Sequence, residues 1–168
     1  MPGRSVVLIG FMGAGKSAIG RELAKRTRLL RQDTDELVRA RFGSPIREIF
    51  AQHGEEVFRN AETEVLRKLE NKPAMIVVTG GGIILREENV RLLRLLGMTI
   101  WLDADEEILW HRASRRGNRP LLQTTNPREK FSALLRERRP LYQAAAERRI
   151  DTSNASIVDV AIEITEIL

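Results

Sequence analysis

The sequence predicts an α/β fold in which a parallel five-stranded sheet lies between two layers of helices. Short apolar runs of strand length alternate along the 168 residues with longer segments of helical periodicity. A glycine-rich loop joins the first apolar run to the first helical segment. Strands that alternate with helices form parallel sheets, and the sites of such sheets lie at the carboxyl ends of the strands. We expect one domain over residues 1–168.

The expected strands recur between helical segments. The strands are expected over residues 5–9, 28–32, 75–78, 98–102 and 149–152. The helices are expected over residues 18–25, 55–70, 87–96, 105–115, 128–146 and 157–168. Gly97 is expected to stop a helix directly before the fourth strand.

The composition is that of an ordinary globular chain, with 42% apolar and 30% charged residues. No apolar run has the length of a membrane span. After residues 1–4 the sequence passes directly into a strand, which leaves no room for a signal peptide. The absence of cysteine excludes disulfides and thiolate metal sites and fits a cytoplasmic protein.

The positive charge gathers in one segment. The net charge is +5, and residues 112–139 carry nine basic residues against Glu129 and Glu137, a local balance of +7. Such a segment suits either a nucleic acid or a pocket for small polyanions. Nucleic-acid binders usually interleave aromatic residues for stacking, and here Phe131 stands alone. The segment therefore favours small anions.

Residues 10–17 match the phosphate-loop pattern G-x-x-x-x-G-K-[ST] at every fixed position. A strand precedes the loop and a helix follows it, which argues against a chance match. The backbone N–H groups and the helix N-terminus are expected to surround a polyphosphate. Lys16 would reach the β- and γ-phosphates, and the Ser17 hydroxyl is placed to ligate Mg²⁺. The loop predicts a nucleoside triphosphate site.

Two carboxylates follow the second expected strand. Asp33 and Asp35 lie two residues apart, a spacing that aims both side chains the same way in extended chain. One could serve Mg²⁺ while the other reaches an acceptor hydroxyl, although Asp35 could instead cap a helix. Asp103, after the fourth strand, competes as a metal residue. We favour Asp33 because the third strand ends in Thr79 and glycines, without an acid.

Further residues suit an acidic small molecule. Arg59 borders the buried face of a helix and Glu62 can orient it, although a solvated surface pair would have the same spacing. Arg138 shares a helical face with apolar residues and should point inward. Arginine binds a carboxylate through two parallel hydrogen bonds. A triplet that lets a ligand approach the main chain consists of Gly80, Gly81 and Gly82.

Two segments interrupt the alternation. Residues 34–62 are expected to hold a substrate, with two short helical pieces over 34–52 that break at residues 43–45. Residues 114–127, which carry Arg119, are expected to form a lid. Plain connecting loops remain the alternative for each segment.

Taken together, these motifs resemble those of the shikimate kinase family over essentially the whole chain. The motifs that carry the resemblance are residues 10–17, Asp33 with Asp35, G-E-E-V-F-R at 54–59, residues 80–82, R-P-L-L at 119–122 and R-R-P-L-Y at 138–142. The resemblance implies a nucleoside-monophosphate-kinase-like fold with sheet order 2-3-1-4-5. It also implies MgATP-dependent phosphorylation of the 3-hydroxyl of shikimate, in aromatic amino-acid biosynthesis.

The resemblance further implies a role for each site residue. Asp35 would hold the shikimate hydroxyls and accept a proton, and Arg59 and Arg138 would bind its carboxylate beside the three glycines. Asp33 and Ser17 would support Mg²⁺. Lys16 and Arg119 would act on the transferring phosphoryl group, with Arg112 near adenine. The residues implied to contact ATP are Gly13, Ala14, Gly15, Lys16, Ser17, Ala18, Arg112 and Arg119.

The chain departs from the family pattern at three places. Ala18 stands where many members have threonine, residues 151–157 are short and lack proline, and the lid does not align tightly. A gluconate kinase, which shares the loop and fold, is the nearest alternative. A nucleic-acid-binding NTPase that uses residues 112–139 is another. We expect a monomer that binds ATP and shikimate, without nucleic-acid or membrane partners.

Overall fold

The computed structural model describes residues 4–116 and 120–168, and its centre is a five-stranded parallel sheet of order β2-β3-β1-β4-β5. The strands are β1 (Ser5–Ile9), β2 (Leu30–Asp33), β3 (Met75–Val78), β4 (Gly97–Asp103) and β5 (Arg148–Asp151). The expected fold class and strand order are therefore confirmed.

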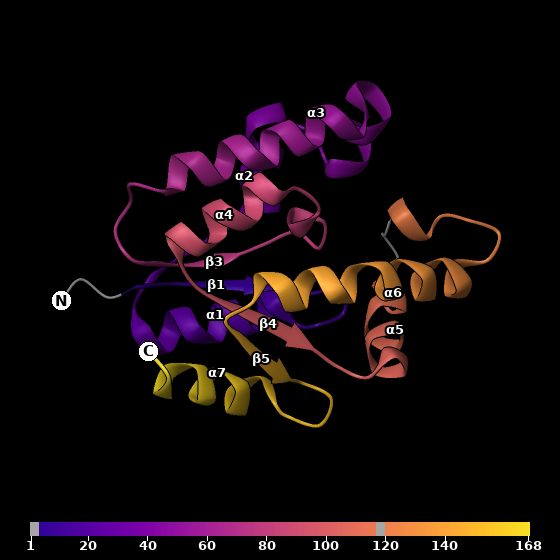
Figure 1. The fold of residues 1–168 in the computed structure, drawn as a ribbon. Helices are drawn as coiled ribbons and strands as arrows, with labels where there is room; N and C mark the ends of the chain where they lie inside the picture. The colour runs from indigo at the N-terminus through magenta and orange to yellow at the C-terminus, as the bar shows by residue number, and fades with distance from the viewer. Residues whose placement is uncertain (1–3, 117–119) are drawn as a thin grey trace.

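Strand β1 lies at the middle of the sheet because its residues are apolar on both faces. Val7 pairs with Val77 of β3 and with Thr99 of β4, and all five residues of β1 are buried. A parallel strand covered on both faces requires such a continuous apolar run. The phosphate loop follows the carboxyl end of β1 and therefore begins at the middle strand of the sheet (Figure 1).

Helices cover both faces of the sheet (Figure 1), with α1 packed against α7 on one face and α4 and α6 on the other. The helices are α1 (Lys16–Thr27), α2 (Thr34–Phe42), α3 (Ile46–Leu69), α4 (Glu87–Leu96), α5 (Glu106–Ser114), α6 (Pro127–Ala145) and α7 (Ile157–Glu166). Two short 3₁₀ turns are η1 (Ile83–Leu85) and η2 (Pro120–Leu122). Within the described residues no helix is long and apolar enough to cross a membrane.

Several boundaries differ from those expected by a residue or two, and the starts of α3 and β2 differ for reasons that the structure shows. Helix α3 begins nine residues before the expected position 55, and a kink at Gly54 (φ 80°, ψ 170°) divides it. The expected break at residues 43–45 lies between α2 and α3, and the helical piece after it continues across Gly54 into the helix expected from residue 55. Strand β2 begins at Leu30 rather than at residue 28, because Arg28 adopts a left-handed conformation (φ 58°) that ends α1.

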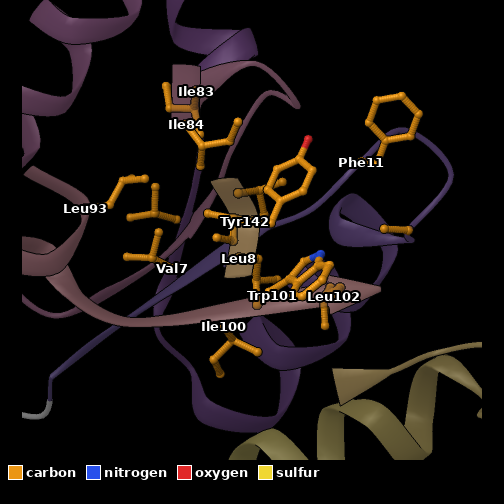
Figure 2. Close-up of a cluster of buried hydrophobic side chains, with 14 of the residues drawn as sticks. Val7, Leu8, Phe11, Ile83, Ile84, Leu93, Ile100, Trp101, Leu102 and Tyr142 are labelled. Carbon is orange, nitrogen blue, oxygen red and sulfur yellow. The ribbon is translucent and has the colours of Figure 1, made fainter. Parts of the chain in front are cut away.

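The core between the sheet and α6 fixes the position of that helix. Figure 2 shows Tyr142 of α6 beside Trp101 of β4, and the two rings stack with centroids 6.0 Å apart. Phe131, also of α6, packs edge-on against Phe11 of the phosphate loop at 5.0 Å. Each of these four residues is at least 96% buried. Arg138, one helical turn before Tyr142, is thereby held at the carboxyl end of the sheet.

Candidate active site

A cavity of about 1200 Å³ lies at the carboxyl ends of the central strands. It brings together every predicted site residue that the structure describes. These are Gly13, Ala14, Gly15, Lys16, Ser17, Ala18, Asp33, Asp35, Arg59, Gly80, Gly81, Gly82, Arg112 and Arg138. Arg119 of the expected lid lies outside the described residues.

The phosphate loop has the backbone shape that a polyphosphate requires. Gly13 (φ 86°) and Gly15 (φ 90°) occupy the left-handed region, and a Cβ at Gly13 would collide with the Leu109 carbonyl. Helix α1 follows directly, without an acidic residue in its first turn or a side-chain cap. Its N-terminal N–H groups therefore suit an anion. Lys16 Nζ donates to Gly10 O at 2.6 Å and Phe11 O at 3.1 Å, which holds the ammonium across the loop.

Two residues beside the phosphate loop could hold a magnesium ion whose other ligands would be phosphate and water oxygens. Ser17, in the first turn of α1, and Asp33, at the end of β2, both line the cavity. The described ranges contain no cluster of three or more His, Cys, Asp or Glu residues that could hold a metal. Mg²⁺ commonly takes only one or two protein oxygens beside substrate phosphates, so this sparse set is sufficient.

Of the two aspartates considered for the metal, Asp33 has the better position. Asp103 is 2% exposed, pairs with Arg139 and Arg149, and does not line the cavity. Asp33 Oδ1 accepts from the backbone N–H groups of Asp35 at 3.0 Å and Glu36 at 3.3 Å. Asp33 is thus the N-cap of α2, and the capping alternative for Asp35 is wrong.

Asp35 lies in the first turn of α2, so the two aspartates do not share the extended segment that their spacing suggested. The Asp35 carboxylate instead packs against Gly80, where a Cβ would lie 2.5 Å from Oδ1. Burial raises the pKa of Asp35, and the charge of Asp33 adds to this, while Lys16 opposes it. A carboxylate with a raised pKa in a cavity is suited to accept a proton.

Arg59 is buried and held by two carboxylates. Its Nη1 donates to Glu62 Oε2 at 2.7 Å, and its Nε and Nη2 donate to Glu55 Oε1 at 3.3 and 3.2 Å. Glu62 is 1% exposed, so the expected orienting pair is confirmed and the solvated surface pair is wrong. Gly82 packs directly on the guanidinium, with space for no side chain between them.

Arg138 is a second buried arginine of the cavity. It is 4% exposed, and its Nε has no hydrogen-bond partner among the described residues. No acid within residues 4–116 and 120–168 forms a salt bridge with it. Its Cζ lies 5.8 Å from the centroid of the Phe11 ring, whose face attracts the cation. A buried cation of this kind provides a site for an anionic group of a ligand.

Alanine at position 82 should displace Arg59. Gly82 has φ −95°, which alanine tolerates, but its Cβ would lie within 2.7 Å of Arg59 Cζ. We expect the KM for a carboxylate-bearing acceptor to rise about tenfold, because a binding group moves by about an ångström. Steady-state kinetics will measure this. The Kd for ADP is the control, and an unchanged KM would contradict the contact.

The sequence did not identify the apolar wall of the cavity or the contact that holds Arg112. Phe50 and Phe58 line it with ring centroids 4.7 Å apart, but they lie on opposite sides of the Gly54 kink. Arg112 donates to Thr152 Oγ1 at 3.1 Å and to Thr152 O at 2.8 Å. The segment after β5, which departs from the family pattern, therefore does reach the cavity.

The geometry combines a phosphate loop, two aspartates and two inward-facing arginines in one cavity. Phosphoryl transfer needs such a combination of positioning and charge neutralisation. The fold and the site therefore define a P-loop kinase that acts on a small acceptor molecule. The family model for shikimate kinase matches residues 12–168. The chain belongs to the shikimate kinase family.

Individual relatives agree with the family match. The shikimate kinase of Symbiobacterium thermophilum is 45% identical over 96% of this chain and 94% of its own. That of Moorella thermoacetica is 44% identical over 100% and 95%. The structure is similar to that of shikimate kinase from Acinetobacter baumannii in complex with shikimate, with TM-score 0.92 and 36% identity over 98% and 92% of the two chains. The chain is an ATP-dependent kinase that uses Mg²⁺.

Proposed function

We propose that this chain transfers the γ-phosphoryl group of MgATP to the 3-hydroxyl of shikimate, a step of aromatic amino-acid biosynthesis. The observation that carries the proposal is that Arg138 is buried, forms no salt bridge among the described residues, and lies in the same cavity as Asp35 and the phosphate loop. Shikimate bears one carboxylate, which suits the Arg138 cation, and several hydroxyls, which can donate hydrogen bonds to the Asp35 carboxylate. The complex of the A. baumannii relative with shikimate supports the same substrate.

The acceptor half of the cavity would hold shikimate by its two kinds of polar group. Arg138 and Arg59 would bind the carboxylate, since a guanidinium donates two parallel hydrogen bonds. Gly80, Gly81 and Gly82 would let the ring approach the main chain. Asp35 would accept a hydrogen bond from the reacting hydroxyl and take its proton as the phosphoryl group arrives.

The donor half would hold ATP mainly through backbone groups. The loop around Gly13, Ala14 and Gly15, with the N-terminus of α1 at Ser17 and Ala18, would surround the β- and γ-phosphates. Mg²⁺, when bound beside Ser17 and Asp33, would neutralise phosphate charge. Lys16 would turn from the Gly10 and Phe11 carbonyls to the transferring phosphoryl group. Arg119 of the lid would contact the same group. Arg112 would lie beside adenine.

The same function goes with a substrate-binding segment, a lid, a monomeric protein and a cytoplasmic location. We propose residues 34–62 as the substrate-binding segment and 114–127 as a lid. We propose that the protein acts as a monomer. In the basic segment Arg128 and Arg139 pair with Glu106 and Asp103, which supports small-anion rather than nucleic-acid binding. Use of ATP favours the cytoplasm.

Shikimate-dependent release of ADP tests the proposed function. A coupled assay with shikimate or gluconate, with and without Mg²⁺, should show turnover with shikimate and Mg²⁺ together. Faster turnover with gluconate would overturn the substrate. Salt-sensitive binding of DNA or RNA without metabolite-dependent ADP release would overturn the reaction.

Glu62 should make shikimate affinity depend on pH. Burial raises the pKa of Glu62 to about 7, and Arg59 and Arg138 oppose this, while Asp35 adds to it. A bound carboxylate would raise this pKa further, so binding favours the protonated form. Affinity is therefore highest below the pKa of the free enzyme, about 7, and falls as the pH rises from that value to the higher pKa of the complex. We expect KM to rise about threefold between pH 6.5 and 8.

The matched variants are Glu62→Gln and Glu55→Gln. Both side chains contact Arg59, but Glu55 is exposed and Glu62 is buried. The first variant should remove the pH dependence of KM and the second should keep it. Equal slopes in the wild type and in Glu62→Gln would show that another group titrates.

A further inference from the structure

Arg31 links two acidic residues beside the metal side of the cavity. It lies two residues before Asp33 on the edge strand β2, so both side chains share one face. Its Nη1 donates to Asp33 Oδ2 at 3.2 Å, and its Nη2 donates to Glu36 Oε1 and Oε2 at 2.8 and 3.0 Å. The guanidinium therefore divides its charge between the two carboxylates.

The position of Arg31 is fixed by packing. Its side chain is 19% exposed, and its Cδ would lie 3.7 Å from a Cβ built on Gly20 of α1. The stem thus runs along the helix that carries the phosphate loop, while the head contacts α2 through Glu36. Carboxylates raise the pKa of Arg31, with Glu36 the largest contributor, so the side chain carries a full charge.

Both oxygens of Asp33 consequently have hydrogen-bond donors. Oδ1 accepts from the backbone N–H groups of Asp35 and Glu36, and Oδ2 accepts from Arg31. A cation at this distance offsets part of the carboxylate's charge. A divalent ion beside Asp33 would experience this reduced attraction, and the Asp33 carboxylate could not turn freely toward it.

We propose that Arg31 is a positioning residue that lowers the affinity of the enzyme for its divalent ion through Asp33, and that Glu36 limits this effect. The inference rests on the proposed function, which places Asp33 on the metal side. Glu36 limits the effect because it neutralises the same guanidinium. The Arg31–Glu36 pair therefore sets how strongly the Asp33 carboxylate attracts the metal ion.

Opposite changes in metal affinity distinguish this role from a structural one. Mn²⁺ is titrated into the enzyme–ADP complex, and electron paramagnetic resonance measures the free ion. Arg31→Met should tighten Mn²⁺ binding about fivefold, because the opposing charge is removed. Glu36→Gln should weaken Mn²⁺ binding about threefold, because the Arg31 charge is then no longer shared with Glu36 and offsets more of the Asp33 charge. Arg31→Lys keeps the charge and should remain within about twofold of the wild type.

The Asp33→Asn variant separates failure of the inference from failure of the metal assignment. It should weaken Mn²⁺ binding, and adding Arg31→Met to it should then change nothing further. If Asp33→Asn binds Mn²⁺ as the wild type does, the metal assignment fails, and the inference with it. If Asp33→Asn weakens binding but Arg31→Met and Glu36→Gln shift it in the same direction or not at all, the inference alone is overturned. Because Glu36 is exposed, its variant keeps the test decisive even if Arg31→Met does not fold.

Discussion

Asp35→Asn should lower kcat about 10³-fold while the Kd for ADP changes by less than about threefold. The amide keeps the size of the carboxylate but cannot accept the proton of the acceptor hydroxyl. The change should leave the fold intact, because Asp33 and not Asp35 caps α2. Coupled kinetics and calorimetric titration with ADP give the two quantities.

The control for this prediction is Glu48→Gln, which removes an exposed carboxylate from the first turn of α3 outside the cavity. It should leave kcat unchanged. The wild-type kcat should also rise with pH through the pKa of Asp35, which burial raises above its ordinary value. Near-normal turnover of Asp35→Asn at any pH would remove Asp35 from the proton transfer.

The parts of the site that the sequence predicts are those carried by local patterns. The phosphate loop needs only residues 10–17 between a strand and a helix, and its geometry follows from glycine conformations. The apolar run of β1 and the alternation of elements similarly predict a parallel sheet. Asp33 and Asp35 could be placed at the cavity because the carboxyl ends of parallel strands meet at one edge.

Other features depend on contacts between distant segments, which no local pattern contains. The spacing of Arg59 and Glu62 predicts that they pair, but the burial of that pair comes from packing against Gly82 of another element. The contact of Arg112 with Thr152 joins residues 40 positions apart. No sequence pattern marks Arg31, because its contacts with α2 and its position along α1 arise only in the folded chain.

Arg138→Lys should raise the KM for shikimate about 10²-fold with little change in kcat. The wild-type guanidinium is buried and forms no salt bridge with a carboxylate of the described residues, so the ligand's carboxylate would be its direct acidic partner. Lysine keeps the charge but replaces a planar two-pronged donor by a single ammonium, which loses one of the two parallel hydrogen bonds and its alignment. Steady-state kinetics on the same preparation, with thermal unfolding as a check on the fold, will measure the loss.

A second substrate shows whether the loss comes from the carboxylate contact itself. The methyl ester of shikimate lacks the charge, so the wild type should bind it about 10²-fold more weakly than the acid. If Arg138 binds the carboxylate, replacing shikimate by its ester should weaken binding to Arg138→Lys far less than it weakens binding to the wild type. The two changes remove the same interaction. Arg136→Lys, an exposed neighbour on α6, should behave as the wild type with both substrates. Additive losses in Arg138→Lys would mean that this arginine stabilises the cavity without touching the acid, and Arg59 would then be the carboxylate's main partner.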